Sequence, residues 1–237
     1  MNLLKVLVES FRMLLDQPKM FLPKIFSTSI STIWILSFPG LHSGQVSSVE
    51  VSSLIYYVAS MPLIVLLGVF VSVMLAEMVA DKPSLRRSLM KTLNKWKTLL
   101  AVSAGIIFSA VLLYIPTVLG IVTTFMTGRI VFTGAGVAVS LLLLLGFSFA
   151  IFFLPISIAE GNGLLSSFSN SLNASKKNSR EVSVLMVFSL ALLGVAFSMQ
   201  GPLQSISIIG FIVSRFTSAI TTTYLFVVSP RMYLTDK

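Results

Sequence analysis

Arg215 is the residue whose type and position point most directly to chemistry, because it lies in the middle of a long apolar segment. A charge at the centre of a membrane-spanning helix is costly, so it normally faces other helices and has a partner there. Ser218 and Thr222 follow at helical spacing and would form a polar patch with it. One interpretation is a contact with an anion or a lipid phosphate. The preferred interpretation is a structural arginine bonded to helix-end carbonyls or to a carboxylate.

Glu77 and Glu160 are the carboxylates considered for that role, and each follows an alanine at the end of an apolar segment. A proton-coupled transporter or permease subunit could use this pair together with Arg215. We prefer a local role, in which each carboxylate caps the following helix or pairs with a base such as Arg86 or Lys176. A helix N-terminus stabilises a negative charge by about 0.3–1 kcal/mol, which would favour such a cap.

Other residue types that carry chemistry are scarce. The chain has no cysteine and one histidine, His42, which falls in a predicted loop outside the membrane. No metal-ligand spacing, nucleophile–base pair or phosphate-binding glycine loop is present in the sequence. We therefore expect no enzyme activity, no catalytic residue, no metal site and no cofactor, and an enzyme acting on lipids ranks third among the functions considered.

Composition indicates a membrane protein. The chain is 55% hydrophobic and 11% charged, with a mean hydropathy of +0.96, whereas soluble domains have about 25% charged residues. So few polar residues cannot cover a soluble core, and lipid must be the solvent. The formal net charge of +9 could indicate nucleic-acid binding. Short basic loops on one side of a membrane explain it better, so no nucleic-acid partner is expected.

Long apolar runs predict an all-α bundle of six membrane-spanning helices, since one crossing takes about 20 residues. Gly128-Arg129 and Gly134-Ala135-Gly136 should mark one short outer turn. Gly201-Pro202 should split the last long run, because proline lacks an amide donor. Small-residue packing faces are predicted at Ala101, Gly105 and Ser109 in span three, at Gly194 and Ser198 in span five, and at Gly210, Ser214, Ser218 and Thr222 in span six. The spans are expected at about 20–38, 51–80, 98–126, 137–159, 182–199 and 205–228.

The basic residues predict the orientation. Of 17 Lys and Arg residues, 15 lie in the two termini or in the loops after spans two and four. Cytoplasmic loops carry such an excess, so both termini should be cytoplasmic. The expected location is the cytoplasmic membrane, which the chain would cross several times.

Three segments have the pattern of amphipathic helices lying in the membrane interface, at about 1–17, 85–97 and 164–177. The second combines an apolar stripe with five bases, and each base near an anionic leaflet contributes about 1 kcal/mol to binding. The alternative is a solvated loop, which we consider less favoured. Contact with anionic lipids of the cytoplasmic leaflet is predicted for Arg86, Arg87, Lys91, Lys95 and Lys97.

The same order of residues recurs along the chain and predicts three tandem units, at about 1–80, 81–163 and 164–237. Ser88-Leu89 and Ser171-Leu172 each follow a glutamate at the same distance, and Ser10-Phe11 occupies the matching place near the start. Each unit would be an interfacial helix followed by a helical hairpin. Three units of one orientation suggest a bundle with approximate three-fold symmetry, within a single transmembrane domain.

Several short motifs lie along the predicted cytoplasmic edge, namely Ser10-Phe11-Arg12, Pro18-Lys19, Phe21-Leu22-Pro23, Pro155, Ala159-Glu160-Gly161 and Ser171-Leu172. Together they resemble a loosely related group of six-span bacterial and archaeal membrane proteins, which includes the YciC-like proteins and the membrane domain of some glycerophosphodiester phosphodiesterases. The resemblance implies a fold more than an activity. The phosphodiesterase catalytic domain is absent, so no catalytic residue is carried over.

The leading hypothesis is a non-enzymatic integral membrane protein that organises lipid or a membrane complex through its basic cytoplasmic edge. A protein partner or a second copy of the chain is left open. The alternative is a small transporter or permease subunit that uses Arg215 with Glu77 and Glu160. A cavity that reaches Arg215 would favour transport, and a packed core with a flat basic rim would favour the scaffold.

Overall fold

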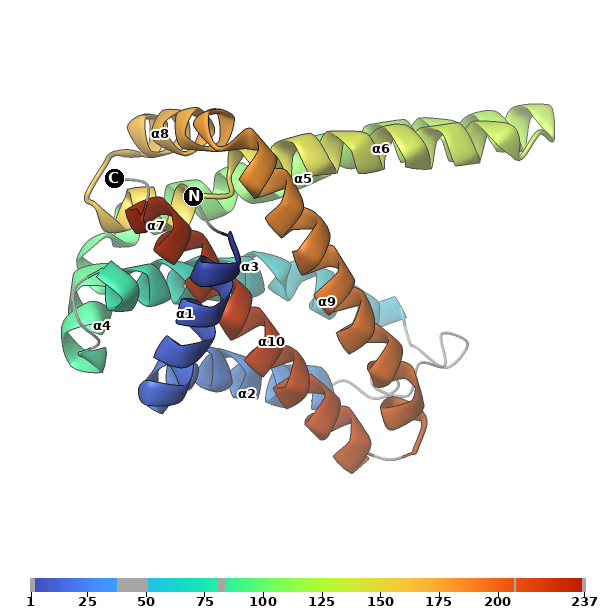
Figure 1. The fold of residues 1–237 in the computed structure, drawn as a ribbon. Helices are drawn as coiled ribbons and strands as arrows, with labels where there is room; N and C mark the ends of the chain where they lie inside the picture. Colours follow the sequence, from blue (N-terminus) through green and yellow to red (C-terminus); the bar gives the residue numbers. More distant parts are fainter. Residues whose placement is uncertain (1–2, 38–50, 81–83, 207, 236–237) are drawn as a thin grey trace.

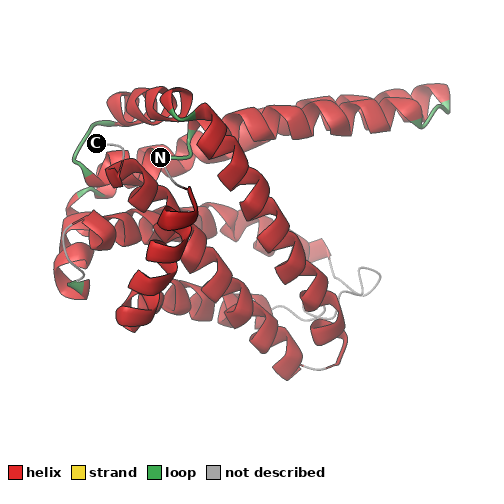
Figure 2. Ribbon diagram, viewed as in Figure 1, coloured by secondary structure: helices red, strands yellow, loops and turns green. Residues whose placement is uncertain are grey.

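The structure is a computed structural model that describes residues 3–37, 51–80, 84–206 and 208–235. Every regular element in these ranges is a helix, as Figure 2 shows. In chain order the helices are α1 (Leu3–Asp16), the 3₁₀ helix η1 (Pro18–Phe21), α2 (Leu22–Leu36), α3 (Val51–Ala80), α4 (Leu85–Asn94), α5 (Trp96–Thr127), α6 (Val131–Ala150), α7 (Leu154–Ala159), α8 (Leu164–Lys177), α9 (Ser179–Ile206) and α10 (Ile208–Thr235).

The long helices form three hairpins, α2–α3, α5–α6 and α9–α10, and one of the helices α1, α4 and α8 precedes each hairpin (Figure 1). These three shorter helices lie toward one end of the molecule, where α10 also ends, and the hairpins extend away from that end. The α5–α6 hairpin projects furthest from the rest. The all-helical prediction is therefore confirmed.

Within the described residues, five segments are long and apolar enough to cross a membrane, which identifies a multi-pass membrane protein. The first predicted span is not among them, because its helix α2 has 15 residues and a length of about 22 Å, short of the ~30 Å hydrocarbon layer. Phe38, the predicted end of that span, and His42 lie outside the described residues. The five segments are Val58–Ala80, Trp96–Thr127, Val131–Ala159, Ser179–Ala196 and Ile208–Thr235.

Two predicted helix boundaries were wrong. The turn between α5 and α6 comprises residues 128–130 only, with Gly128 in the left-handed conformation at φ 70°, and Gly134 and Gly136 already belong to α6. Gly201-Pro202 does not end α9, which continues to Ile206. A proline removes a single backbone hydrogen bond, and a membrane helix tolerates that loss where other groups replace it.

Close backbone contact holds α5 against α6. A Cβ atom added to Gly136 would meet the carbonyl oxygen of Pro116, and one added to Gly120 would meet that of Phe132. Two hydroxyl pairs, Thr117–Ser140 and Thr124–Thr133, are each joined by a 2.8 Å hydrogen bond across the hairpin.

The packing faces predicted for spans three and five lie elsewhere on those helices. Gly105 of α5 and Gly194 of α9 are exposed, and a Cβ atom on either would meet nothing within 4 Å. The face of span six agrees better, since Ser214 is buried. Small residues permit close packing, but the turn and the neighbouring helices decide which small residues are used.

The predicted fourth span is broken between α6 and α7. Ser171 of α8 accepts a hydrogen bond from the amide of Phe153 at 3.2 Å and donates one to the carbonyl of Ala150 at 2.8 Å. Ser229 of α10 donates to the carbonyl of Phe152 at 2.7 Å. Pro155 stands in the first turn of α7. Two serines from other helices thus pair backbone groups that the interrupted helix does not satisfy.

The helices α4 and α8 are buried along a face of small hydroxyl residues, and α1 buries Ser10 between Val6 and Leu14. Ser10, Ser88 and Ser171, which match one another in the sequence pattern, are each no more than 3% exposed. Other large apolar side chains of the same helices are exposed, as Leu4 and Leu165 illustrate. The buried apolar core lies at the same end of the molecule, where these helices pack on α3, α7 and α10.

Candidate functional site

A polar cavity of about 230 Å³ lies between α2, α3 and α10. Two cations, Lys24 and Arg215, line it together with five hydroxyl side chains, and Gly68 of α3 forms part of the opposite wall. Because α2 and α10 contact each other and bring both cations to this cavity, the site joins the first and the last hairpin of the chain. The five hydroxyl residues are Ser27, Thr28, Ser31, Ser218 and Thr222.

Each cation is positioned by a specific neighbour. The Nη2 atom of Arg215 donates a hydrogen bond of 2.7 Å to the Oγ atom of Ser31. The Nζ atom of Lys24 lies 5.3 Å from the centre of the Phe226 ring, within the range of a cation–π interaction. Lys24 and Ser31 are two helical turns apart, so the polar lining extends for about 10 Å along α2.

The structure brings together part of the predicted polar site. Arg215, Ser218 and Thr222 line the cavity as one group, but Glu77 and Glu160 are not among the described residues that line it. The hydrogen bond of Arg215 to Ser31 is a contact with a hydroxyl side chain.

Sequence reasoning missed the contribution of α2. Lys24 lines the cavity from within the bundle. Ser27, Thr28 and Ser31 are buried beside it. A signal was available in the sequence, because five of the six residues from 27 to 32 carry a hydroxyl group. In an apolar helix, such a polar face marks the side that packs against other protein.

Glu77 has a different role, since it is 3% exposed at the end of α3 and pairs with bases that follow α3. The Nζ atom of Lys95 contacts its Oε1 atom, and the Nζ atom of Lys91 lies 3.8 Å from its Oε2 atom. Lys95 also donates to the carbonyl oxygen of Ala159 at the end of α7. The predicted local pairing of Glu77 is present, with Lys91 and Lys95 in the place considered for Arg86.

Glu160 follows Ala159 but lies in an exposed position. Its Oε2 atom accepts a hydrogen bond of 3.2 Å from the hydroxyl of Tyr233 near the end of α10. The two glutamates that match in the sequence thus have different environments. One is buried in an ion pair, and the other contacts a tyrosine at the surface.

The five bases predicted to contact lipid have three different environments. Arg86, Arg87 and Lys97 are exposed, and the Nζ atom of Lys97 lies 5.8 Å from the centre of the Trp96 ring. Lys91 is intermediate in exposure. Lys95 points inward to Glu77, so its ammonium group is committed to an internal contact.

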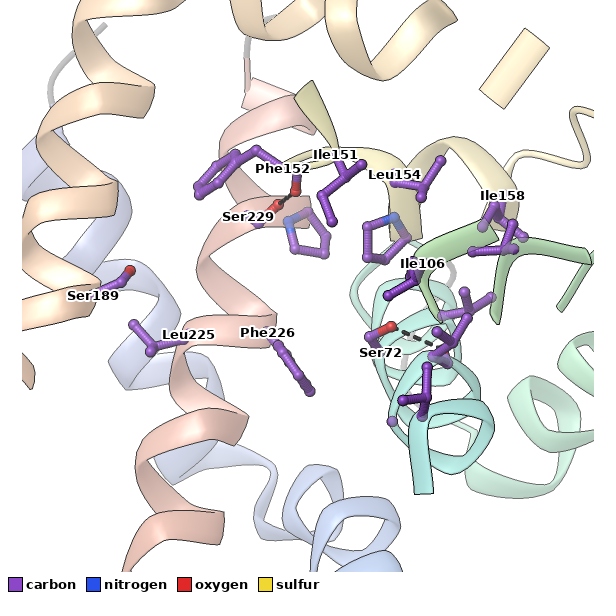
Figure 3. Close-up of a pocket in the computed structure, with 17 residues that line it drawn as sticks. Ser72, Ile106, Ile151, Phe152, Leu154, Ile158, Ser189, Leu225, Phe226 and Ser229 are labelled. Atoms are coloured by element: carbon purple, nitrogen blue, oxygen red, sulfur yellow. Dashed lines mark hydrogen bonds between the residues drawn. The ribbon is translucent and has the colours of Figure 1, made fainter. Parts of the chain in front are cut away.

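An apolar cavity of about 430 Å³ adjoins the polar one at Gly68, which lines both. Figure 3 shows its side chains arranged around a central space, with Phe226 and Ser229 of α10 on one side and Ser72 of α3 and Ile106 of α5 on another. Phe152, from the break between α6 and α7, also lines it. All three hairpins contribute to this cavity.

Chemically, the polar cavity can bind an anion. Guanidinium and ammonium groups form charge-assisted hydrogen bonds to phosphate or carboxylate oxygens, and hydroxyl groups can complete the coordination. Within the described ranges no group of three or more His, Cys, Asp or Glu residues could hold a metal ion. The arrangement therefore has the character of a binding site.

Comparisons of the chain with protein-family models, with curated proteins and with solved structures found no match in any of the three. The fold and the site geometry are therefore the basis on which a function can be proposed.

Proposed function

We propose that the chain is a non-enzymatic integral membrane protein that binds anionic lipids and organises lipid or a membrane complex at the cytoplasmic leaflet. In this proposal it has six spans, the first of them formed by the short helix α2 together with η1 before it. The spans are built from three tandem units of an interfacial helix and a hairpin, and both termini are cytoplasmic. The short motifs that resemble the six-span family of YciC-like proteins and phosphodiesterase membrane domains support the same architecture.

The observation that carries the proposal is the three-sided character of α4, which α1 and α8 share in part. Each of these helices buries one side against the bundle, through hydroxyl residues in α4 and α8 and through Ser10 with Val6 and Leu14 in α1, and exposes large apolar side chains. In α4 the exposed bases Arg86 and Arg87 occupy a further side. A helix with one side on protein, one side apolar and one side basic fits the boundary between a bundle, the acyl chains and an anionic headgroup layer.

Lipid nanodiscs test this proposal. The triple variant Arg86→Gln, Arg87→Gln, Lys97→Gln should retain less phosphatidylglycerol around the protein than the parent does, measured by lipid analysis of nanodiscs from mixed phosphatidylcholine and phosphatidylglycerol. Each exposed base near the leaflet is worth about 1 kcal/mol. The single variant Arg129→Gln, at the opposite end of α5, is the matched control and should change nothing. Equal lipid composition in all samples would contradict the proposal.

A second function, transport, is favoured by one observation, which is the cavity that reaches Arg215. In this version Lys24 would act with Arg215, in place of the two glutamates. Because the chain has no cysteine, a single Ser218→Cys variant can be labelled with membrane-impermeant thiol reagents from either side of a vesicle. A transporter should be labelled from both sides, and protection from at least one side would argue against transport.

A further inference from the structure

The polar and apolar cavities are adjacent and have opposite chemical character. Gly68 lines both, and a Cβ atom added to it would meet nothing within 4 Å, so open space lies at their junction. Phe226 links them from α10, because it lines the apolar cavity while Lys24 lies over its ring. A cationic, hydroxyl-rich compartment therefore meets a larger apolar compartment inside the bundle.

We propose that these two cavities form one binding site for an anionic phospholipid held within the bundle. Lys24 and Arg215 would bind the phosphate, Ser31 and the other hydroxyl groups would complete its hydrogen bonds, and an acyl chain would occupy the apolar cavity beyond Gly68. The site differs from the basic rim of α4, because it lies between α2, α3 and α10.

The chemistry of the lining favours an amphiphile over a free anion. Phosphate oxygens match the donors of arginine and lysine, which a free phosphate and a phospholipid headgroup share. An apolar cavity of about 430 Å³ directly beside those donors fits a hydrocarbon chain. Ligand sites are commonly apolar pockets with a few polar groups that set orientation, and this pair of cavities has that division.

The headgroup is tested with delipidated protein in detergent, by native mass spectrometry with added lipid. The probes are phosphatidylglycerol and phosphatidylcholine with identical acyl chains, and inorganic phosphate as a third. Both lipids carry the phosphate that Lys24 and Arg215 would bind, but the choline ammonium of phosphatidylcholine would be repelled by these two cations, so we expect phosphatidylglycerol to bind at least about tenfold more tightly. Equal binding of both lipids, or binding of inorganic phosphate as tight as that of the lipid, would overturn the proposal.

Two substitutions test the cations independently. Arg215→Gln and Lys24→Gln should each weaken phosphatidylglycerol binding about tenfold, whereas Arg129→Gln should leave it unchanged. If Arg215→Gln does not fold, Arg215→Lys replaces it as a variant that retains the positive charge. Lys24→Gln still tests the assignment of the headgroup. Unchanged binding in a folded Lys24→Gln variant would contradict the assignment of the headgroup.

The acyl chain is tested by filling the apolar cavity from α9. Ser189 lines that cavity but not the polar one, so Ser189→Phe should reduce binding of long-chain phosphatidylglycerol severalfold. Ser183→Phe is the matched control, because Ser183 is exposed on the same helix. Equal binding by both variants would place the chain outside this cavity.

This inference rests on the proposed lipid-binding function, but the two can fail separately. Loss of binding in the Lys24 and Arg215 variants with no effect of the α4 triple variant would support the internal site and contradict lipid binding by the exposed bases of α4. The converse result would support lipid binding by those bases and contradict the internal site.

Discussion

The ammonium group of Lys95 contacts the buried carboxylate of Glu77, and through it the segment after α4 is tied to the end of α3. The same ammonium group donates to the carbonyl of Ala159 at the end of α7. One lysine therefore connects three helix ends. This places a base from the predicted lipid-binding set inside the protein.

Glu77→Gln should lower the free energy of unfolding by about 1–3 kcal/mol. Removing one member of a buried ion pair leaves the other charge without its partner. The loss of stability is limited because Lys95 keeps some exposure to solvent. Denaturation in detergent, followed by circular dichroism, measures the effect. Glu160→Gln is the control at the matching sequence position. It should cost less, because its carboxylate is exposed, and equal losses in the two variants would contradict this account.

Ser171→Ala should destabilise the protein by about 1–3 kcal/mol, because the amide of Phe153 and the carbonyl of Ala150 both lose a partner at a buried site. Ser175→Ala is a close control. Ser175 lies one turn further along α8, is equally buried, and its hydroxyl has no hydrogen bond to the described residues. Thermal unfolding in detergent should separate the two variants. A loss in Ser175→Ala as large as that in Ser171→Ala would count against the proposed role.

Gly136→Ala should separate α5 from α6 and cost about 1–3 kcal/mol, as expected when extra atoms are forced into a packed contact. The added methyl group would meet the carbonyl of Pro116. Gly146→Ala, in the same helix, has open space around its Cβ position and should be neutral or slightly stabilising. Melting temperatures of the two variants in one detergent provide the comparison. A Gly136→Ala variant as stable as the parent would show that α5 and α6 pack less closely than the contact between Gly136 and Pro116 indicates.

Single cysteines should report the orientation of the chain, since the parent has none. Ser84→Cys precedes α4, and Arg129→Cys lies in the turn between α5 and α6, so the two probes stand at opposite ends of α5. A membrane-impermeant maleimide added to intact cells should label Arg129→Cys and leave Ser84→Cys unlabelled. The opposite pattern would invert the proposed topology.

The sequence alone predicted the helical class and most elements. The apolar runs located the five long segments, because a chain that must satisfy its backbone hydrogen bonds in lipid forms helices of predictable length. The periodic pattern at 164–177 located α8 correctly. Local signals were less reliable at Gly201-Pro202, where a single missing amide did not end the helix.

The polar cavity could not be predicted without the tertiary structure. Arg215, Ser218 and Thr222 are neighbours on one helix, so their grouping followed from helical spacing alone. Lys24 and Ser31 come from α2, almost the full length of the chain away, and spacing along the sequence cannot show that they meet Arg215.

The same limit applies to the two glutamates. Their sequence contexts are alike, and the sequence by itself determined only that each stands at the end of an apolar segment. The packing of α4 and α7 buries Glu77 in an ion pair, while Glu160 lies exposed beside Tyr233. Composition and periodicity determine which segments enter the membrane, because that choice depends on each segment's own transfer free energy. Which polar groups meet inside the bundle depends on how separate helices pack, and only the tertiary structure decided that.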